Sequence, residues 1–420
     1  MRVLIVGAGI GGLTTALSLH EAGVETLLID SAVRLRPLGV GINLLPHAVR
    51  ELTELGLGGE LAEIGIPTAE MVHFDRHGGR IWGEPRGRAL GYNWPQYSIH
   101  RGELQMTLLE AVVARLGADA VRTGTVFEGF EQDGAEVRAL LRDRASGTTE
   151  TVRADVLVGA DGLHSAVRRQ LNPGEPAPLW NGIRMWRGVA EAEPFLTGRT
   201  MAVAGSNVTS KIVVYPISMR AEQRGRALLN WVAEVKLDGD HLERDADWNR
   251  GGRLADVLPH FEDWTFDWLD VPALIKASSE ILEYPMVDRD PLERWTSGRV
   301  TLLGDAAHPM YPIGSNGGSQ AVLDARVLAH ELAVARDPHS GLLAYERARR
   351  EKVNAIVLAC RDMPADRVLH TVSERAPKGF STIEDVLRPE ELSTITGAYR
   401  QTSFSDVEAL NSRPSYSKTA

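Results

Sequence analysis

Short, almost continuous apolar runs recur along this 420-residue chain and mark its predicted strands. Val3 to Val6 is such a run, and apolar residues then recur at helical spacing from Leu13 to Ala22. Asp155 to Ala160 and Arg299 to Leu303 contain two more runs of the same kind. Strands buried on both faces of a parallel sheet are apolar almost throughout, so the pattern predicts an α/β fold with a parallel sheet.

Three glycines occupy the turn between the first predicted strand and the first helix. Gly7, Gly9 and Gly12 have the spacing of a dinucleotide-binding loop: one for the tight turn, one for the approach of a pyrophosphate and one for close helix packing. The free N–H groups at the helix N-terminus attract phosphate. A second strand, Thr26 to Ile29, ends at Asp30, where an acid is expected to hold ribose hydroxyls. We therefore predict a dinucleotide site, with a plain glycine-rich turn as the alternative.

Two further motifs end predicted strands. Asp161-Gly162 and Gly304-Asp305 each follow a buried apolar run, at the edge of the sheet where ligands bind in open α/β folds. Residues 310–318 form a loop rich in glycine and proline, and a helical pattern follows from Ser319 to Ala333. Amides beside a helix N-terminus stabilise negative charge, such as that of a reduced flavin.

The pattern changes in the middle and at the end of the chain. Four β-type runs separated by turns predict an inserted β-sheet domain that carries a substrate pocket; they are Ile183 to Val189, Thr200 to Ala204, Lys211 to Ile217 and Arg226 to Val235. Residues 64–95, with Gly78-Gly79 as a hairpin turn, are expected to add strands to this sheet. We expect the tryptophans of residues 238–277, including Trp248, to pack between short helices. Frequent proline, serine and charged residues from Met363 onward predict a peripheral tail that frays at its end.

Composition narrows the class of protein. A net charge of -10 and a pI near 5.7 argue against nucleic acid or an anionic membrane as a partner. No apolar stretch reaches the ~18 residues that cross a bilayer, and the first strand follows Met1 directly, so we expect no signal peptide and a cytoplasmic protein. The single cysteine, Cys360, excludes an internal disulfide and is expected to be a buried structural thiol. His73 and His77 precede a Gly-Gly turn, so we expect no metal site.

These motifs together resemble the class A flavoprotein aromatic hydroxylases, the group that includes p-hydroxybenzoate and salicylate hydroxylases. The likeness covers nearly the whole chain; it rests on Gly7 to Leu13, Arg101 with Gln105, Gly159 to Arg168, and Gly304 to Pro309. Within the group the chain is most similar to phenazine hydroxylases, through Arg36 to Asn43, Pro95 to Met106, Met185 to Val189, and Tyr284 to Pro291.

The resemblance implies a Rossmann-like FAD-binding domain made of residues 1–72, 98–175 and 285–362. It also implies a β-sheet substrate domain made of residues 73–97 and 176–284, and a helical C-terminal tail made of residues 363–420. The expected cofactor is non-covalent FAD, held by Gly7, Gly9, Gly12, Asp30, Val40, Gly41, Arg101, Gln105, Asp161, Asp305, Pro312, Gly314, Asn316 and Gly317.

The resemblance further implies a reaction in which NADH or NADPH, bound transiently, reduces FAD and O2 supplies the oxygen atom that enters an aromatic ring. The expected substrate is a phenazine-1-carboxylate, hydroxylated with loss of CO2, and no residue is assigned as a catalytic acid, base or nucleophile. Candidate pocket residues are Trp186, Arg187, Tyr215, Met310 and Tyr311, each of which is equally well explained as ordinary core. The protein is expected to be a monomer or a homodimer.

Other functions stay open. The segment Gly205 to Lys211 differs from the phenazine hydroxylases, so the substrate is alternatively salicylate, a hydroxybenzoate or an aromatic polyketide. A flavin halogenase would share the FAD half, but its Trp-x-Trp-x-Ile-Pro signature is missing. A non-enzymatic flavin-scaffold binding protein would not need the complete set of FAD contacts that this chain has.

Overall fold

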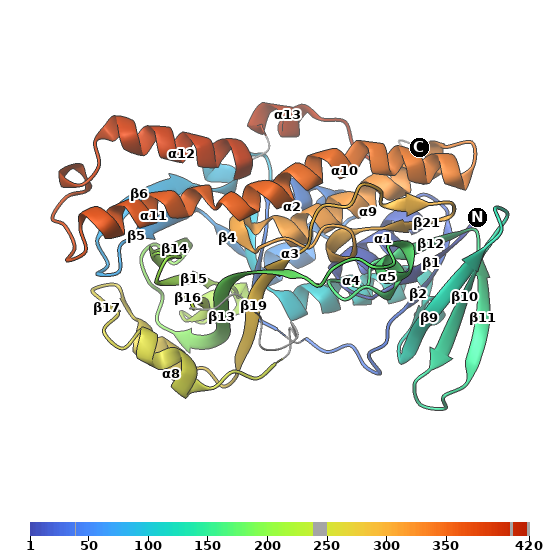
Figure 1. Cartoon of the computed structure of the whole chain (residues 1–420), viewed down its shortest axis with the longest axis horizontal. Helices are drawn as coiled ribbons and strands as arrows, with labels where there is room; N and C mark the ends of the chain where they lie inside the picture. Colours follow the sequence, from blue (N-terminus) through green and yellow to red (C-terminus); the bar gives the residue numbers. More distant parts are fainter. Residues whose placement is uncertain (38, 238–249, 404–405, 418–420) are drawn as a thin grey trace.

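The computed structural model describes residues 1–37, 39–237, 250–403 and 406–417, so Trp248 lies outside the described residues. Two sheets dominate the molecule, and the C-terminal helices run along its length beside both of them (Figure 1). Residues 312–315, in a loop that follows the first sheet, face the second sheet across the pocket described below.

The first sheet is the predicted parallel sheet, with strand order β20-β21-β12-β1-β2-β8. All neighbouring strands are parallel except the edge strand β20. In the centre, Val3 pairs with Val156 on one side and with Thr26 on the other, so β1 is covered by hydrogen bonds on both edges. The strands are β1 (Arg2–Val6), β2 (Glu25–Ile29), β8 (Val121–Arg122), β12 (Val156–Gly159), β20 (Thr296–Ser297) and β21 (Val300–Leu302).

Helices bury their apolar sides against this sheet and against one another. Helix α1 packs against both α4 and α9, and α9 in turn packs against α10. The helices are α1 (Ile10–Glu21), α4 (Arg101–Leu116), α5 (Ala166–Leu171), α9 (Asn316–Val334) and α10 (Pro338–Asp362). A separate three-stranded antiparallel sheet lies at one end of the molecule (Figure 1); its strands are β9 (Thr125–Gln132), β10 (Val137–Asp143) and β11 (Thr149–Ala154).

The second large sheet has seven strands in the order β19-β13-β16-β15-β14-β5-β6. The hairpin turn predicted at Gly78-Gly79 joins β5 to β6, and Gly78 has a φ of 86° that favours glycine. The strands are β5 (Glu70–Phe74), β6 (Arg80–Pro85), β13 (Leu179–Ala192), β14 (Thr200–Gly205), β15 (Ser210–Pro216), β16 (Ala227–Lys236) and β19 (Ile281–Asp288).

Successive side chains of each strand point to opposite sides, so the second sheet has two different faces. On one face Met185 and Tyr284 join the core of the first sheet and its helices, whereas Trp186 and Trp231 on the other face join a core completed by α8 (Val271–Lys276). The tryptophans Trp264 and Trp268 belong to the same outer core, as the sequence predicted.

Smaller elements connect the two halves. A three-stranded sheet in the order β3-β7-β4 contacts both α9 and β15. Helices α2 and α3 come between its strands β3 and β4 in the sequence. The elements of this connection are β3 (Gly41–Leu44), β4 (Ile66–Thr68), β7 (Gln96–His100), α2 (Pro46–Glu54) and α3 (Gly58–Ile64). Four short elements lie beside the second sheet: α6 (Met219–Glu222), α7 (Leu254–Val257), β17 (Thr265–Phe266) and β18 (Leu269–Asp270). Short 3₁₀ turns cover Gly87–Leu90, Ala118–Ala120, Leu258–His260, Gly304–Ala306, Ile313–Ser315 and Ile383–Asp385.

The C-terminal region is helical as predicted, but the prediction that it is peripheral was wrong for α11. Helix α11 (Pro364–Arg375) buries Val368, Leu369 and Val372 against the second sheet. The prediction relied on the frequent proline and charged residues and overlooked these three apolar positions. After α12 (Pro389–Ser403) and α13 (Val407–Ser412), the chain returns to α2, where the Arg50 guanidinium donates to the carbonyl of Leu410 at 2.9 Å. The fraying predicted at the very end concerns residues 418–420, which lie outside the described residues. Within the described residues, no helix combines the length and apolar character needed to cross a bilayer.

Candidate functional site

The glycine loop between β1 and α1 has the geometry that a bound pyrophosphate requires. A Cβ atom at Gly7, whose φ is 107°, would lie 2.4 Å from the carbonyl oxygen of Ala160. A Cβ at Gly12 would lie 1.9 Å from the oxygen of Gly7, so both positions exclude any side chain. A Cβ at Gly9 would meet nothing within 4 Å. The loop is therefore closed on the protein side and open at Gly9, where the phosphates of a dinucleotide fit.

Two predicted cofactor residues hold this loop through the backbone of Ala8. The Asp30 carboxylate accepts hydrogen bonds from the N–H groups of Ala8 and Ala32, both at 2.8 Å. From the other side, the Gln105 amide nitrogen donates to the carbonyl of Ala8 at 2.7 Å. Both side chains therefore fix the shape of the glycine loop. Contact of Asp30 with the ribose, and of Gln105 with FAD, stay predictions.

Asp305 lies at the carboxyl edge of the sheet, just after β21. Its neighbours Gly304 and Ala306 are buried, but its side chain is accessible and forms no hydrogen bond with a described residue. Protein atoms still crowd around the carboxyl group, and this burial raises its pKa, while His308 and Arg101 act in the opposite direction. The carboxylate faces the start of α9, 3.9 Å from the position of a Cβ at Gly317. An accessible acid in a crowded cleft fits the hydroxyl groups of a bound cofactor.

Arg101 starts α4 on the same cleft. Its backbone N–H donates to the carbonyl of Val40 at 2.9 Å, whereas its exposed guanidinium makes no hydrogen bond within the described part of the chain. The same charge acts to lower the pKa of Asp305 and of Tyr284, which places it within electrostatic range of both sheets. A guanidinium in this position fits the phosphate of a dinucleotide.

Asp161 has a different surrounding from Asp305, although both end parallel strands. Its carboxylate accepts from the Ser165 hydroxyl and from the N–H groups of Ala166 at 2.7 Å and Val167 at 3.2 Å. Burial raises the pKa of Asp161 and outweighs these hydrogen bonds, which act to lower it. The side chain caps the start of α5, and its contact with FAD stays a prediction.

The segment Val40-Gly41 lies where the two halves touch. Gly41 donates its N–H to the Asn230 side-chain oxygen at 2.7 Å, and a Cβ at Gly41 would lie 2.8 Å from Asn230 and from Ile217. Asn230 is fully buried on β16 and was not predicted from the sequence. A single polar residue in the apolar run from Leu228 to Val232 is the signal that could have found it.

The loop before α9 is shaped by backbone conformation. Gly314 and Ser315 both have positive φ values, 70° and 60°, and the buried Asn316 begins the helix. The Ser319 hydroxyl accepts from the N–H of Leu45 at 3.0 Å, which ties the loop to β3. Pro312 is exposed, and the first N–H groups of α9 lack intrahelical partners, as at any helix start. These amides suit the negative charge of a reduced flavin, which supports the prediction for Asn316 and Gly317. The contacts of Pro312 and Gly314 with the cofactor stay predictions.

A buried polar cluster that the sequence did not reveal holds the turn carrying Asp305. Asp324 on α9 accepts from His308 at 2.5 Å and from the Gly304 N–H at 3.1 Å through one oxygen. Its other oxygen accepts from Arg349 at 2.8 Å. Burial acts to raise the pKa of Asp324, but His308 and Arg349 together lower it to about 2. An acid among the apolar positions of α9 was the only sign in the sequence.

The predicted pocket residues do not lie together. Trp186 is 1 % exposed on the outer face of the second sheet, where its indole N–H donates to Glu283 at 3.2 Å, so the structure does not place it at the junction. Arg187 and Tyr215 lie on the inner face, with the Arg187 guanidinium 5.2 Å from the centre of the Tyr284 ring. Burial raises the pKa of Tyr215 to about 12. Met310 and Tyr311 are 9 % and 5 % exposed in the core of the first sheet and its helices.

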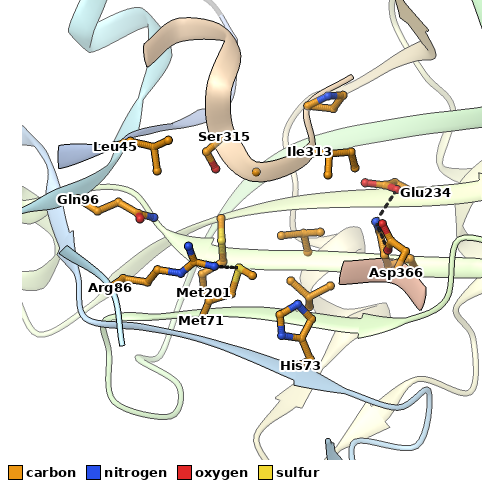
Figure 2. Close-up of a pocket in the computed structure, with 15 residues that line it drawn as sticks. Leu45, Met71, His73, Arg86, Gln96, Met201, Glu234, Ile313, Ser315 and Asp366 are labelled. Carbon is orange, nitrogen blue, oxygen red and sulfur yellow. Dashed lines mark hydrogen bonds and ion pairs between the residues drawn. The ribbon is translucent and has the colours of Figure 1, made fainter. Parts of the chain in front are cut away.

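A pocket lies between the loop before α9 and the inner face of the second sheet (Figure 2). The loop before α9, residues 310–315, forms one wall and is called the flavin loop from here on. Two thioethers, Met71 and Met201, lie on the opposite wall. The lining residues are Leu45, Met71, His73, Arg86, Gln96, Met201, Val203, Lys211, Val213, Glu234, Pro312, Ile313, Gly314, Ser315 and Asp366. They include two predicted cofactor residues, Pro312 and Gly314, and none of the five predicted pocket residues.

Comparison with known proteins gives the same cofactor. The model of the FAD binding domain family matches residues 1–247 and 269–359. The phenazine 1,6-dicarboxylic acid hydroxylase PhzS of Lysobacter antibioticus is 50% identical over 95% of this chain and 96% of its own length. The 3-hydroxybenzoate 6-hydroxylase 1 of Aquipseudomonas alcaligenes is 32% identical over 83% of this chain and 84% of its own. The structure of a variant of Klebsiella pneumoniae HpxO complexed with FAD covers 96% of this chain and 98% of its own with a TM-score of 0.75 and 25% identity.

Proposed function

The chain belongs to the FAD-binding family of aromatic monooxygenases, and we propose that it hydroxylates a phenazine carboxylic acid with consumption of NAD(P)H and O2. The observation that carries the proposal is the 50% identity to a phenazine 1,6-dicarboxylic acid hydroxylase over almost the full length of both chains. The thioether-lined pocket beside the flavin loop supports it, because methionine sulfur packs favourably on aromatic rings.

FAD fits the residues at the carboxyl edge of the first sheet, and when bound it accepts a hydride from NAD(P)H and passes one atom of O2 to an electron-rich ring. Gly7, Gly9 and Gly12 would admit its pyrophosphate, and Arg101 and Asp305 would bind its phosphate and hydroxyl groups. The chain itself needs to supply no nucleophile. Its tasks are to hold the cofactor, to exclude water and to fix the substrate ring beside the flavin loop.

The finer part of the proposal is that the new hydroxyl group replaces a carboxylate. In that reaction one oxygen atom of O2 forms the new C–O bond, and the C–C bond to the carboxylate breaks with release of CO2. NAD(P)H is oxidised, the second oxygen atom leaves as water, and two protons are taken up. Attack at this carbon is reasonable because the ring regains its aromaticity when CO2 departs.

Carboxyl-labelled phenazine-1-carboxylate tests this directly. The purified enzyme with FAD, NADH or NADPH, and O2 should release labelled CO2 and form a hydroxyphenazine. A hydroxylated product that retains its label would contradict the loss of CO2 but not the proposed hydroxylation of a phenazine. Turnover of simple benzoates without turnover of any phenazine would contradict the proposed substrate and favour the second candidate, a hydroxybenzoate, which the 32% identity to a 3-hydroxybenzoate hydroxylase supports.

We also propose that the enzyme works in the cytoplasm as a monomer or a homodimer. The domain division given above, with residues 73–97 and 176–284 as the substrate domain, belongs to the same proposal. Analytical ultracentrifugation of the holoenzyme checks the oligomeric state, and a tetramer or larger assembly would contradict it. Cell fractionation with an antibody against the chain checks the location.

A further inference from the structure

One end of the pocket carries three ionisable side chains that face one another. The Lys211 ammonium nitrogen on β15 lies 2.9 Å from an oxygen of Asp366 on α11 and 3.0 Å from an oxygen of Glu234 on β16. Lys211 and Glu234 are only 3 % and 4 % exposed, and Asp366 is buried as well. Figure 2 shows Glu234 and Asp366 together at this end, away from Arg86 and Gln96. We call these three residues the lysine cluster.

The lysine cluster has one carboxyl group more than it has cations. Burial raises the pKa of Glu234, although Lys211 acts to lower it. Burial acts to lower the pKa of Lys211, but Asp366 and Glu234 together raise it, so the ammonium stays charged. Arg187 from β13 also acts on Glu234, and His73 from β5 is neutral because burial lowers its pKa to about 3. Glu234 is therefore the member whose charge changes most easily.

Two polar atoms elsewhere in the pocket walls have no hydrogen-bond partner in the described structure. They are the side-chain oxygen of Gln96 and a ring nitrogen of His73, and both residues are more than nine-tenths buried. A buried polar atom without a partner is unfavourable, because nothing compensates its removal from water. Complementary polar groups on a ligand would remove this cost, so the pocket favours a ligand with a polar edge.

The cation at the other end of the pocket is already matched. An Arg86 nitrogen lies 2.6 Å from an oxygen of Glu84, and both side chains are buried. Met71 and Met201 lie near Arg86 in the middle of the pocket (Figure 2) and carry no charge. The lysine cluster is therefore the part of the lining where an entering charge can be compensated.

We propose that the lysine cluster binds a carboxylate of the aromatic substrate and that Glu234 takes up a proton as this carboxylate enters. The inference rests on the proposed function and specifies which residues recognise its substrate. Protonated Glu234 donates a hydrogen bond to the carboxylate, Lys211 supplies the positive charge, and Asp366 holds Lys211 in place. One anion and one proton enter together, so the net charge of the buried group does not change, which avoids the large cost of burying an unpaired charge.

Proton uptake makes binding depend on pH in a specific way. Above the pKa of Glu234 in the free enzyme, the Kd of a carboxylate ligand should rise by up to about tenfold per pH unit, because one proton must be bound with it. Unsubstituted phenazine should bind with a Kd that does not change in this range. Both expected dependences of Kd on pH can be measured by ligand titration of the FAD-loaded enzyme across the neutral and alkaline range. Binding is followed as a change in flavin absorbance, and the ligands are phenazine, phenazine-1-carboxylate and phenazine-1,6-dicarboxylate.

Glu234→Gln keeps the size and a hydrogen-bond donor but cannot titrate. It should bind the carboxylates with a Kd that no longer depends on pH. Glu283→Gln is the matched control: Glu283 lies on β19, on the opposite face of the same sheet, where it accepts from Trp186. This control should keep the wild-type pH dependence.

Each result decides the inference. Carboxylate binding to the wild-type enzyme without pH dependence would overturn it, and so would a Glu234→Gln enzyme whose Kd still rises with pH. Both results would leave the proposed phenazine hydroxylation intact. If no phenazine carboxylate binds to the wild-type enzyme at all, the proposed function fails and the inference fails with it.

Discussion

The candidate active site has a flavin wall at the carboxyl edge of the first sheet and a substrate wall on the inner face of the second sheet. The two walls stabilise their polar side chains in different ways. On the flavin wall, Asp30, Gln105 and Asp161 bond to backbone N–H and carbonyl groups. On the substrate wall, Lys211 and Glu234 pair with other ionisable side chains. Backbone groups do not titrate, so these three contacts keep one geometry over a wide range of pH, whereas paired ionisable side chains can exchange a proton. We infer that the flavin wall is built to hold one cofactor and the substrate wall to distinguish substrates.

The largest expected effect comes from Gly12→Ala on the flavin wall. The new Cβ would lie 1.9 Å from the Gly7 oxygen, and neither backbone can move without shifting α1 from β1. We expect the variant to lose FAD almost completely and to unfold at a markedly lower temperature, because overpacking costs about 1–3 kcal/mol or more. Flavin absorbance and thermal unfolding of the purified protein check this.

Gly9→Ala is the matched control for Gly12→Ala. Its Cβ points into open space, so the apoprotein should keep its wild-type melting temperature while FAD binding weakens. Equal flavin content in the Gly12→Ala and wild-type proteins would contradict the assigned geometry of the loop.

The next effect concerns Asp324, which supports the flavin wall from α9. Asp324→Asn leaves His308 and Arg349 without their shared carboxylate, and breaking a buried pair costs about 3–5 kcal/mol. Because the folded-state pKa is lowered to about 2, the carboxylate stabilises the fold above its unfolded pKa, and this contribution is lost as the pH falls toward 2. The free energy of unfolding, measured with urea, should therefore fall less over this acidic range for the variant than for the wild type. An identical acid dependence would remove Asp324 from the network.

A smaller effect is expected from Asp305→Ala, because Asp305 makes no hydrogen bond with a described residue. The apoprotein should keep its stability, whereas FAD affinity should fall about 10- to 100-fold through the loss of charged hydrogen bonds worth about 1.5–3 kcal/mol. Tyr215→Phe on the substrate wall should retain its FAD. Equal FAD affinity of the two variants in a fluorescence titration would place Asp305 outside the cofactor site.

Met201→Leu on the substrate wall should have the smallest effect. The two side chains have similar volumes, and such exchanges usually lower the free energy of unfolding by less than about 1.5 kcal/mol. We expect KM to rise by less than about tenfold, which corresponds to about 1.4 kcal/mol of binding free energy. Flavin content should not change, because Met201 lines the pocket opposite the flavin loop. A loss of FAD in this variant would contradict the separation of cofactor binding and substrate binding between the two walls.

The contrast between the walls also explains what the sequence revealed. The flavin wall comes from short segments in which a strand, a turn and a helix follow one another, so Gly7, Gly12 and Asp30 could be placed by spacing alone. Asp324 was missed because its partners His308 and Arg349 come from two other segments of the chain.

The substrate wall was harder to predict. Its lining residues come from β5, β14, β15, β16 and α11, and only the folded sheet shows which side of each strand faces the flavin half. Trp186 and Arg187 are neighbours in the sequence but lie on opposite faces of the sheet. The residue types alone do not show which of the two faces the pocket. Lys211 and Asp366 are separated by more than a third of the chain, and no sequence pattern joins them.

NAD(P)H oxidation by the FAD-loaded enzyme tests most directly the claim that the substrate wall selects a phenazine carboxylate for hydroxylation. We expect slow oxidation without substrate, a strong increase with phenazine-1,6-dicarboxylate or phenazine-1-carboxylate, and little increase with 3-hydroxybenzoate. Oxygen consumption should match the hydroxylated product formed. A fast rate without any aromatic compound, or stimulation by 3-hydroxybenzoate alone, would contradict the claim.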